Sequence, residues 1–348
     1  MPAARKNISR SYELELIAKS FFEKNYKQFI GSLKKNPTGA IFEHDGKQFE
    51  YGKIERLVSF IGTSEVSQAL KIDGIKDIFH FDSLSADRKK EIIKHSELSL
   101  EEAKKIDIYL SSVNNEYGIS VKDSSQVCKL AQKSKPVDFA GVSLNGGLND
   151  RISRLIEGSE IPESIDYTTT GLRKDQFSKL SQHDEKLAWF KKNQPDRWNL
   201  ETDNALSNAY LQLRNLASEI NKGNKSVLIS LLGIMLSGVN MPCRQFCIWL
   251  EPKLLSVKEF IDNINHEENL PMEAYLHNTP KKSSLIINIE YKGVLYSLTK
   301  IEPSFEGGGV DVSQTKGIIF HFQQFQHPDT NFSIWNLISS AGSDLQSH

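Results

Sequence analysis

Three polar residues in one short stretch have the types and the spacing that phosphate-ester hydrolysis requires. Asp107 is followed by Ser120 and Lys122, which are two residues apart and therefore point to one face of any strand that holds them. A carboxylate can hold a hard cation that lowers the pKa of a bound water, and a nearby ammonium can orient that water or stabilise transition-state charge. These groups, if they converge, favour metal-dependent cleavage of a phosphodiester.

The surrounding sequence predicts the β-hairpin that would make them converge. Ile106–Ser111 alternates with a period of two, Val113–Gly118 has the composition of a turn, and Ile119–Lys122 is predicted to be a second, antiparallel strand. Ser99 and Glu102 have the spacing of a capping box for a short helix before the hairpin. The prediction is a helix–hairpin unit with Asp107, Ser120 and Lys122 on one face.

This pattern resembles the PD-(D/E)xK nucleases, and among them the type II restriction endonucleases. In that family the first acid begins one strand, and the second acid and the lysine lie on the next strand of the hairpin. The matching positions are Asp107, Ser120 and Lys122, and the resemblance covers residues 101–130 of the chain. Two positions depart from the motif, because Ile106 replaces the proline and Ser120 replaces the second acid.

The serine leaves the second metal ligand open. Some family members with a polar residue at this place compensate with a Glu on the helix after the lysine, but Lys135 and Pro136 stand at that distance here. Glu116 is a weaker candidate, because its turn position points it outward. The other candidates are acids of the following segment or of the first helix: Asp123, Asp138, Glu13, Glu15 and Glu23.

The resemblance implies an α/β fold with a central mixed sheet flanked by helices, and Mg²⁺ as cofactor. The implied activity is hydrolysis of duplex DNA at a specific short sequence by a homodimer, since a two-fold dimer most simply cuts two antiparallel strands. Asp107 would bind the metal, Lys122 would position the attacking water, and Ser120 would orient a metal-bound water or the phosphate. Two alternatives stay open: a repair or junction nuclease that reads DNA shape, and a non-catalytic DNA-binding or scaffolding protein with a degenerate nuclease core.

The rest of the chain predicts a nuclease core at residues 1–160 and a DNA-recognition and dimerisation part at residues 161–348, helix-rich first and then rich in strands. The boundary is open between Glu160–Thr170 and the region of Pro195.

A hairpin is expected at Ala40–Tyr51, with an Asp-Gly turn. The expected helices are Ser11–Leu33, Ile54–Ile61, Glu65–Leu70, Ala86–His95, Ser125–Ser134, Asn149–Glu157, Glu201–Asn221 and Ser226–Leu236. The expected strands of the last third are Leu285–Glu290, Val294–Ile301 and Gly317–Phe322.

A basic, aromatic stretch from Gly171 to Trp198 is the candidate DNA-contacting surface. It holds seven Lys and Arg against four acids, interleaved with Phe and Trp. Phosphate contacts are local, so this clustering bears on DNA binding more than the total charge does. A solvated helix face would have a similar composition. The candidate contact residues are Arg173, Lys174, Lys191, Lys192 and Arg197.

Composition narrows the class of protein. The chain has 348 residues and a net charge of −1, from 43 basic and 44 acidic residues, so no overall basic excess points to nucleic acid. Val227–Val239 is its longest apolar run, too short for a membrane span, and the N-terminus lacks the apolar centre of a signal peptide. Three cysteines cannot all pair, and Cys243 and Cys247 lack a second pair of zinc ligands. The expectation is a soluble protein in a reduced, cytoplasmic setting.

Overall fold

A computed structural model gives the fold. It describes residues 15, 41–44, 47–50, 75–81, 84–112, 116–122, 129–133, 135–145, 156–250, 253–279, 282–305, 318–325 and 332–342. The expected helices Ile54–Ile61 and Glu65–Leu70, and Ser11–Leu33 apart from one helical residue, Glu15, lie outside the described residues. None of the helices in the described part is long and apolar enough to cross a membrane.

The chain divides into two compact units, and neither is a continuous stretch of sequence. The first unit combines Met1–Gln126, Leu232–Glu268 and Trp335–His348, and the second combines Val127–Leu231 with Asn269–Ile334. The helix α10 (Lys225–Ser237) contains the division between Leu231 and Leu232. Each unit therefore takes segments from both sides of the predicted boundary near residue 160.

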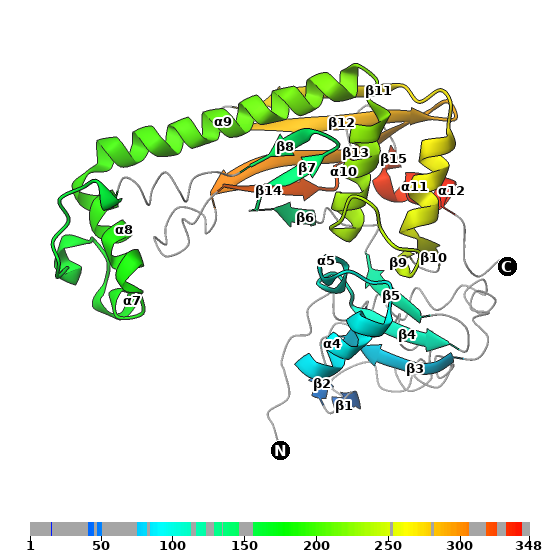
Figure 1. The fold of residues 1–348 in the computed structure, drawn as a ribbon, viewed down its shortest axis with the longest axis horizontal. Helices are drawn as coiled ribbons and strands as arrows, with labels where there is room; N and C mark the ends of the chain where they lie inside the picture. Colours follow the sequence, from blue (N-terminus) through cyan, green and yellow to red (C-terminus); the bar gives the residue numbers. More distant parts are fainter. Residues whose placement is uncertain are drawn as a thin grey trace. The chain divides into compact units, whose positions relative to one another are not determined.

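The first unit is built on a five-stranded mixed sheet with the order β10-β9-β5-β4-β3. Neighbouring strands are antiparallel except β5 and β9, which are parallel. Figure 1 shows β3, β4 and β5 side by side. The strands are β3 (Ile75–His80), β4 (Ile108–Ser112), β5 (Glu116–Val121), β9 (Phe246–Leu250) and β10 (Lys253–Ser256).

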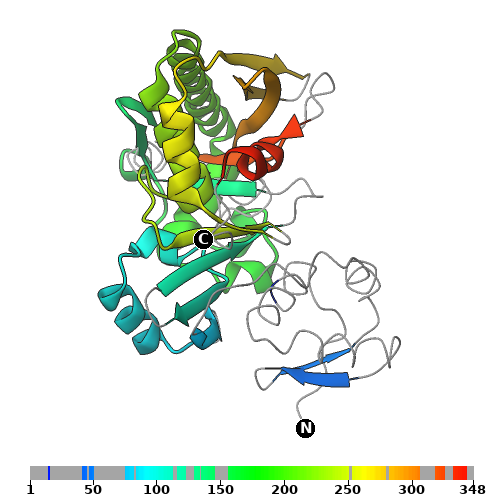
Figure 2. The same cartoon turned by 90° about the vertical axis from the view of Figure 1, so that its right-hand side faces the viewer.

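Helices flank this sheet, so the prediction of an α/β fold with a central mixed sheet and flanking helices is confirmed. Ser85 caps the first of them and Ser99 caps the second, where Glu102 completes the predicted capping box. The helices of the unit are α4 (Ala86–His95), α5 (Leu100–Ala103), α11 (Val257–His266) and most of α12 (Ile334–Ala341). A separate hairpin of β1 (Ile41–His44) and β2 (Lys47–Glu50), blue in Figure 2, confirms the two strands of the hairpin predicted at Ala40–Tyr51.

The second unit is built on a six-stranded sheet along which the long helix α9 (Pro195–Asn221) runs (Figure 1). The Asn221 side chain links the end of that helix to β11. Its Nδ2 donates to the Ala274 carbonyl at 2.8 Å, and its Oδ1 accepts from the Ala274 backbone amide at 2.7 Å. The strand order is β11-β12-β13-β14-β6, with β15 parallel to β13. The strands are β11 (Met272–Asn278), β12 (Ser283–Tyr291), β13 (Val294–Phe305), β14 (Ile318–Gln323), β6 (Lys129–Lys133) and β15 (Phe332–Ser333).

Smaller elements complete the second unit. One is a hairpin of β7 (Val137–Phe139) and β8 (Val142–Leu144), whose Phe139 ring meets the edge of Phe322 on β14 at a centroid distance of 6.2 Å. The basic, aromatic stretch folds into α7 (Lys174–Phe177), α8 (Gln182–Asn193) and the start of α9, after the 3₁₀ turn η3 (Tyr167–Thr169).

An ion cluster forms around a buried carboxylate on β13. Glu302 is only 7% exposed, and its carboxylate pairs with Lys300 at 3.1 Å and with Lys282. Burial alone would raise the pKa of Glu302, but the two ammonium groups outweigh it and hold the pKa below the ordinary value. The carboxylate is therefore ionised at neutral pH.

Two local predictions are wrong. Residues 129–133, inside the helix predicted at Ser125–Ser134, form β6, which pairs with β14; this long-range pairing overrides a weak local helical pattern. Glu116, Tyr117 and Gly118, predicted within a turn, begin β5 and pair with β4. Gly118 fits this strand because a Cβ there would lie 2.4 Å from Ile106 Cδ1, so only glycine leaves room for the isoleucine.

Candidate active site

The register of the β4–β5 hairpin places Asp107 opposite Ser120. Ile108 pairs with Ile119, so the preceding residue on one strand faces the following residue on the other. The Asp107 amide donates to the Ile119 carbonyl at 2.9 Å, and the Asp107 carbonyl accepts from the Phe81 amide at 2.9 Å. Backbone bonds on both sides therefore fix Asp107 directly before β4, close to where the sequence predicted the first acid.

The Asp107 carboxylate and the Ser120 hydroxyl meet at the end of the hairpin. Oδ2 of Asp107 accepts from the Val121 amide at 2.7 Å and, with a longer contact, from Ser120 Oγ at 3.4 Å. Asp107 is half-buried, whereas Ser120 is fully buried with 0% exposure. An amide held in the sheet thus orients an acidic group that solvent still reaches. The same contacts would also serve a carboxylate whose only task is to close the end of a hairpin.

Lys122 follows directly after β5 and is half-buried. Its amide donates to the Trp249 carbonyl at 3.1 Å, so the ladder between β5 and β9 continues one residue beyond the strand. Because side chains alternate along an extended chain, Lys122 lies on the same face as Ser120. The fold thus brings Asp107 and Ser120 into contact and directs Lys122 to their face of the sheet.

The buried Glu102 connects α5, the short helix before the hairpin, to a loop distant in sequence, and sequence analysis missed this contact. One carboxylate oxygen accepts from the amide and the hydroxyl of Ser99, both at 2.8 Å, and the other accepts from the Cys243 amide at 2.9 Å. The second contact spans 141 residues and has no local signal. Burial, followed by the Glu102 charge, raises the pKa of Cys243 to about 12, so this thiol stays protonated and is a poor nucleophile at neutral pH.

Three of the proposed second ligands, Asp138, Glu15 and Glu116, lie in the part of the chain that the structure describes. Asp138 belongs to the second unit, where its exposed carboxylate accepts from the Gly141 amide at 2.8 Å and from Ser143 Oγ at 3.0 Å. Glu15 is helical and half-buried in the first unit. Among the described residues, no group of three or more His, Cys, Asp or Glu is placed to hold a metal ion. Asp123, Glu13 and Glu23 lie outside that part of the chain.

Glu116 is engaged elsewhere on the hairpin. It hydrogen-bonds the Tyr109 hydroxyl, and burial together with this carboxylate raises the pKa of Tyr109 above its ordinary value. The pair holds β4 and β5 together at the end away from Asp107. The carboxylate of Glu116, a weaker candidate for the second metal ligand, is therefore engaged by the Tyr109 hydroxyl.

The five candidate DNA-contacting residues all lie between the N-terminal side of α7 and the first turn of α9, in the second unit. Lys191 is half-buried, with its Nζ 5.6 Å from the centre of the Trp198 ring. The Arg197 guanidinium lies 5.6 Å from the Phe190 ring centre. The aromatic rings are thus packing partners for the cations. Arg173, Lys174, Lys192 and Arg197 are exposed.

Comparison with known proteins adds no relative. No protein-family model, no curated protein and no solved structure matches this chain. The site must be interpreted from its own geometry.

Proposed function

We propose that this protein is a Mg²⁺-dependent endonuclease that hydrolyses phosphodiester bonds of duplex DNA at a specific short sequence, as type II restriction endonucleases do. The contact between the Asp107 carboxylate and the Ser120 hydroxyl, with Lys122 on the same face, carries the proposal. The mixed sheet supports it, because the hairpin lies in the middle of the sheet and is continued by the parallel strand β9.

Asp107 and Ser120 fit a Mg²⁺ ion that has few protein ligands. Mg²⁺ in phosphate-processing sites is bound through one or two carboxylates, several waters and the substrate phosphate, rather than by a full protein cage. Asp107 offers one half-buried carboxylate, and Ser120 adds a neutral oxygen beside it. When bound, such a cation supplies Lewis-acid stabilisation of the phosphate and makes a water more acidic.

Each residue then has a distinct task. Asp107 holds the cation, and the Val121 amide fixes the direction of its carboxylate. Lys122 orients the attacking water and stabilises the negative charge that develops on the phosphate. Ser120 orients a bound water or a phosphate oxygen. Arg173, Lys174, Lys191, Lys192 and Arg197 contact the DNA backbone, and two copies of the chain act on the two strands as a homodimer.

A non-catalytic DNA-binding protein is the second candidate. Ser120 stands where the resembling family usually has an acid, and the described residues contain no group of three metal-ligating side chains. The Asp107 contacts would then serve only the stability of the hairpin. A structure-specific repair nuclease is a third candidate that uses the same catalytic residues.

Digestion of plasmid DNA by the purified chain separates the candidates. We expect cleavage with Mg²⁺ and none with EDTA, with discrete bands for a site-specific enzyme. Lys122→Ala should lower the cleavage rate about 10²–10³-fold, the usual cost of one electrostatic contact in a transition state. Lys104→Ala is the control, because this exposed lysine pairs with Glu101 at 2.6 Å on α5.

Each contrary result points to a different candidate. Equal activity of the Lys122 and Lys104 variants would remove Lys122 from the mechanism. Preference for branched or mismatched DNA without discrete bands would indicate a repair nuclease. DNA binding without cleavage across a broad set of sequences would indicate the non-catalytic protein.

A further inference from the structure

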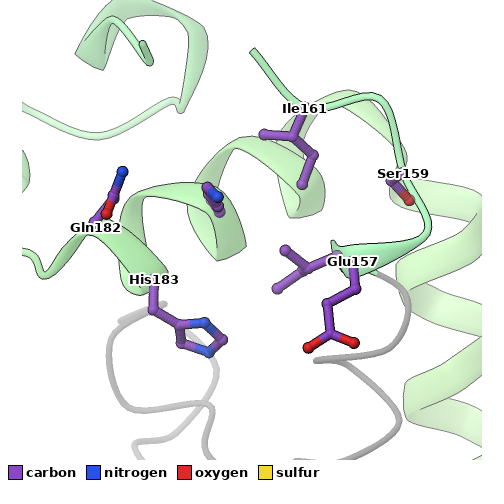
Figure 3. A pocket seen from close by; sticks show the side chains of 7 residues that line it. Glu157, Ser159, Ile161, Gln182 and His183 are labelled. Atoms are coloured by element: carbon purple, nitrogen blue, oxygen red, sulfur yellow. The ribbon is translucent and has the colours of Figure 1, made fainter. Parts of the chain in front are cut away.

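An open pocket of about 460 Å³ lies in the second unit, against the first half of α8. Figure 3 shows His183 at the start of α8 and Glu157 on the facing segment, with open space between their side chains. Ile161 projects from the same segment as Glu157. The lining residues are Ile156, Glu157, Ser159, Ile161, Gln182, His183 and Lys186.

The lining combines a small apolar surface with hydrogen-bonding groups of both kinds. Ile156 is buried and Ile161 half-buried, so together they offer an apolar contact for a flat ring. Glu157 accepts hydrogen bonds, Lys186 donates them, and the Gln182 amide does both. A nucleobase has matching chemistry, with apolar faces and an edge of alternating donors and acceptors. The volume is at the lower end of the range for small-ligand pockets, about 300–1,000 Å³.

The pocket adjoins the basic, aromatic stretch. Lys186 belongs to that stretch and lines the pocket. The Arg197 guanidinium donates to Ser159 Oγ at 3.3 Å and to the Gln194 side chain at 2.8 Å, so this cation is held beside a lining residue. Arg197 is exposed to solvent. A nucleotide whose base enters the pocket could therefore leave its phosphate at a fixed cation outside it.

We propose that this pocket takes one unpaired nucleobase of the DNA that the protein binds. The nature of the nucleic acid rests on the proposed function, whereas the pocket chemistry does not. A base inside a duplex cannot reach such a pocket, so it must leave the stack, at a cost of a few kcal/mol that is smallest where the base is already mismatched. The protein should therefore bind a duplex with one mismatch more tightly than the matched duplex.

Two measurements on the full chain test the proposal. In fluorescence titrations, the single-mismatch duplex should bind at least about 10-fold more tightly than the matched duplex, because a mismatch removes part of the unpairing cost. 2-Aminopurine at the mismatch should brighten on binding as it leaves the stack. Titration with dAMP, dCMP, dGMP and dTMP should show weak binding of at least one of them without any duplex.

Matched variants assign the effect to the pocket. Glu157→Gln and Glu160→Gln make the same change in charge three residues apart, but only Glu157 lines the pocket. We expect the mismatch advantage to fall at least several-fold in Glu157→Gln and in Gln182→Ala, and to stay unchanged in Glu160→Gln. An advantage that is absent in the wild type, or equal in all three variants, overturns the proposal.

The result is separable from that of the nuclease test. Mg²⁺-dependent cleavage without mismatch preference or mononucleotide binding overturns the pocket alone. Mismatch preference lost in Glu157→Gln, in a chain that never cleaves DNA, supports the pocket and overturns the nuclease.

Discussion

Replacing Asp107 by Asn separates the two roles that the carboxylate can have. Asn keeps an oxygen where Oδ2 accepts from the Val121 amide at 2.7 Å and from Ser120 Oγ at 3.4 Å. The side chain keeps its size and one acceptor but loses its negative charge. A role limited to closing the hairpin should therefore survive the change in large part, whereas a role in holding a cation should not.

The sizes of the two effects differ widely. A hydrogen bond to a charged group contributes about 1.5–3 kcal/mol and one between neutral groups about 0.5–1.5 kcal/mol, so the free energy of unfolding should fall by about 1 kcal/mol. The cleavage rate should fall by at least about 10²–10³-fold, because the neutral amide holds a hard cation poorly and the transition-state charge loses its partner. A small loss of stability with a large loss of rate is the expected pattern.

The assay compares urea denaturation midpoints with plasmid cleavage over a series of Mg²⁺ concentrations. Asp166→Asn is the matched control, since this carboxylate also accepts from an amide and a hydroxyl, both of Thr168, at 2.8 and 2.6 Å. Its variant should cleave at the wild-type rate. Cleavage by Asp107→Asn within tenfold of wild type at every Mg²⁺ concentration would refute the assignment of Asp107 as the metal ligand.

Three further outcomes follow from other parts of the chain. Joint replacement of Lys191 and Lys192 by Ala should lower the slope of log affinity against log salt by about one for each phosphate that is no longer neutralised, and sequence preference should be kept. An unchanged slope would show that both lysines belong to a solvated surface without DNA contacts. Gly118→Ala should lower the free energy of unfolding by about 1–3 kcal/mol through overpacking. Adding Ile106→Val removes the atom that would lie 2.4 Å from the new Cβ, so the double variant should regain part of the lost stability in thermal denaturation. A double variant no more stable than Gly118→Ala would contradict this contact. The stabilisation that Glu302 gains from its lowered pKa should be complete above its ordinary pKa of 4.5 and lost as pH falls through the lower folded-state pKa. Glu302→Gln should flatten this acid-side fall in urea midpoints, and an identical pH profile would show that the carboxylate gains nothing on folding.

Short-range signals account for the part of the fold that the sequence predicted. The capping box needs only Ser99 and Glu102, three residues apart, and the β4–β5 hairpin follows from local alternation and a turn. Strand β9 has no such signal, because Phe246–Leu250 is buried on both faces and lacks alternation. Its parallel pairing with β5 depends on chain more than a hundred residues away, which local patterns do not encode.

The same division applies to the candidate site. Asp107 and Ser120 could be paired from sequence because one hairpin register fixes both positions. A second metal ligand could not, because it would come from a segment whose place depends on tertiary packing, as the location of Asp138 in the second unit illustrates. The pocket was missed for a similar reason, since Glu157 and Gln182 belong to separate segments with no shared motif.

The burial of Ser120 gives a physical reason for a hydroxyl at the position where the resembling nuclease family has its second acid. An ionised acid at this fully buried place would pay a desolvation cost and would repel the Asp107 carboxylate, whose Oδ2 lies 3.4 Å from Ser120 Oγ. The hydroxyl instead donates to that oxygen. The proposed metal site then carries one negative charge rather than two, so it holds a cation weakly until a DNA phosphate adds the next ligand. Binding of cation and binding of DNA are therefore expected to strengthen each other, because each supplies charge that the other lacks.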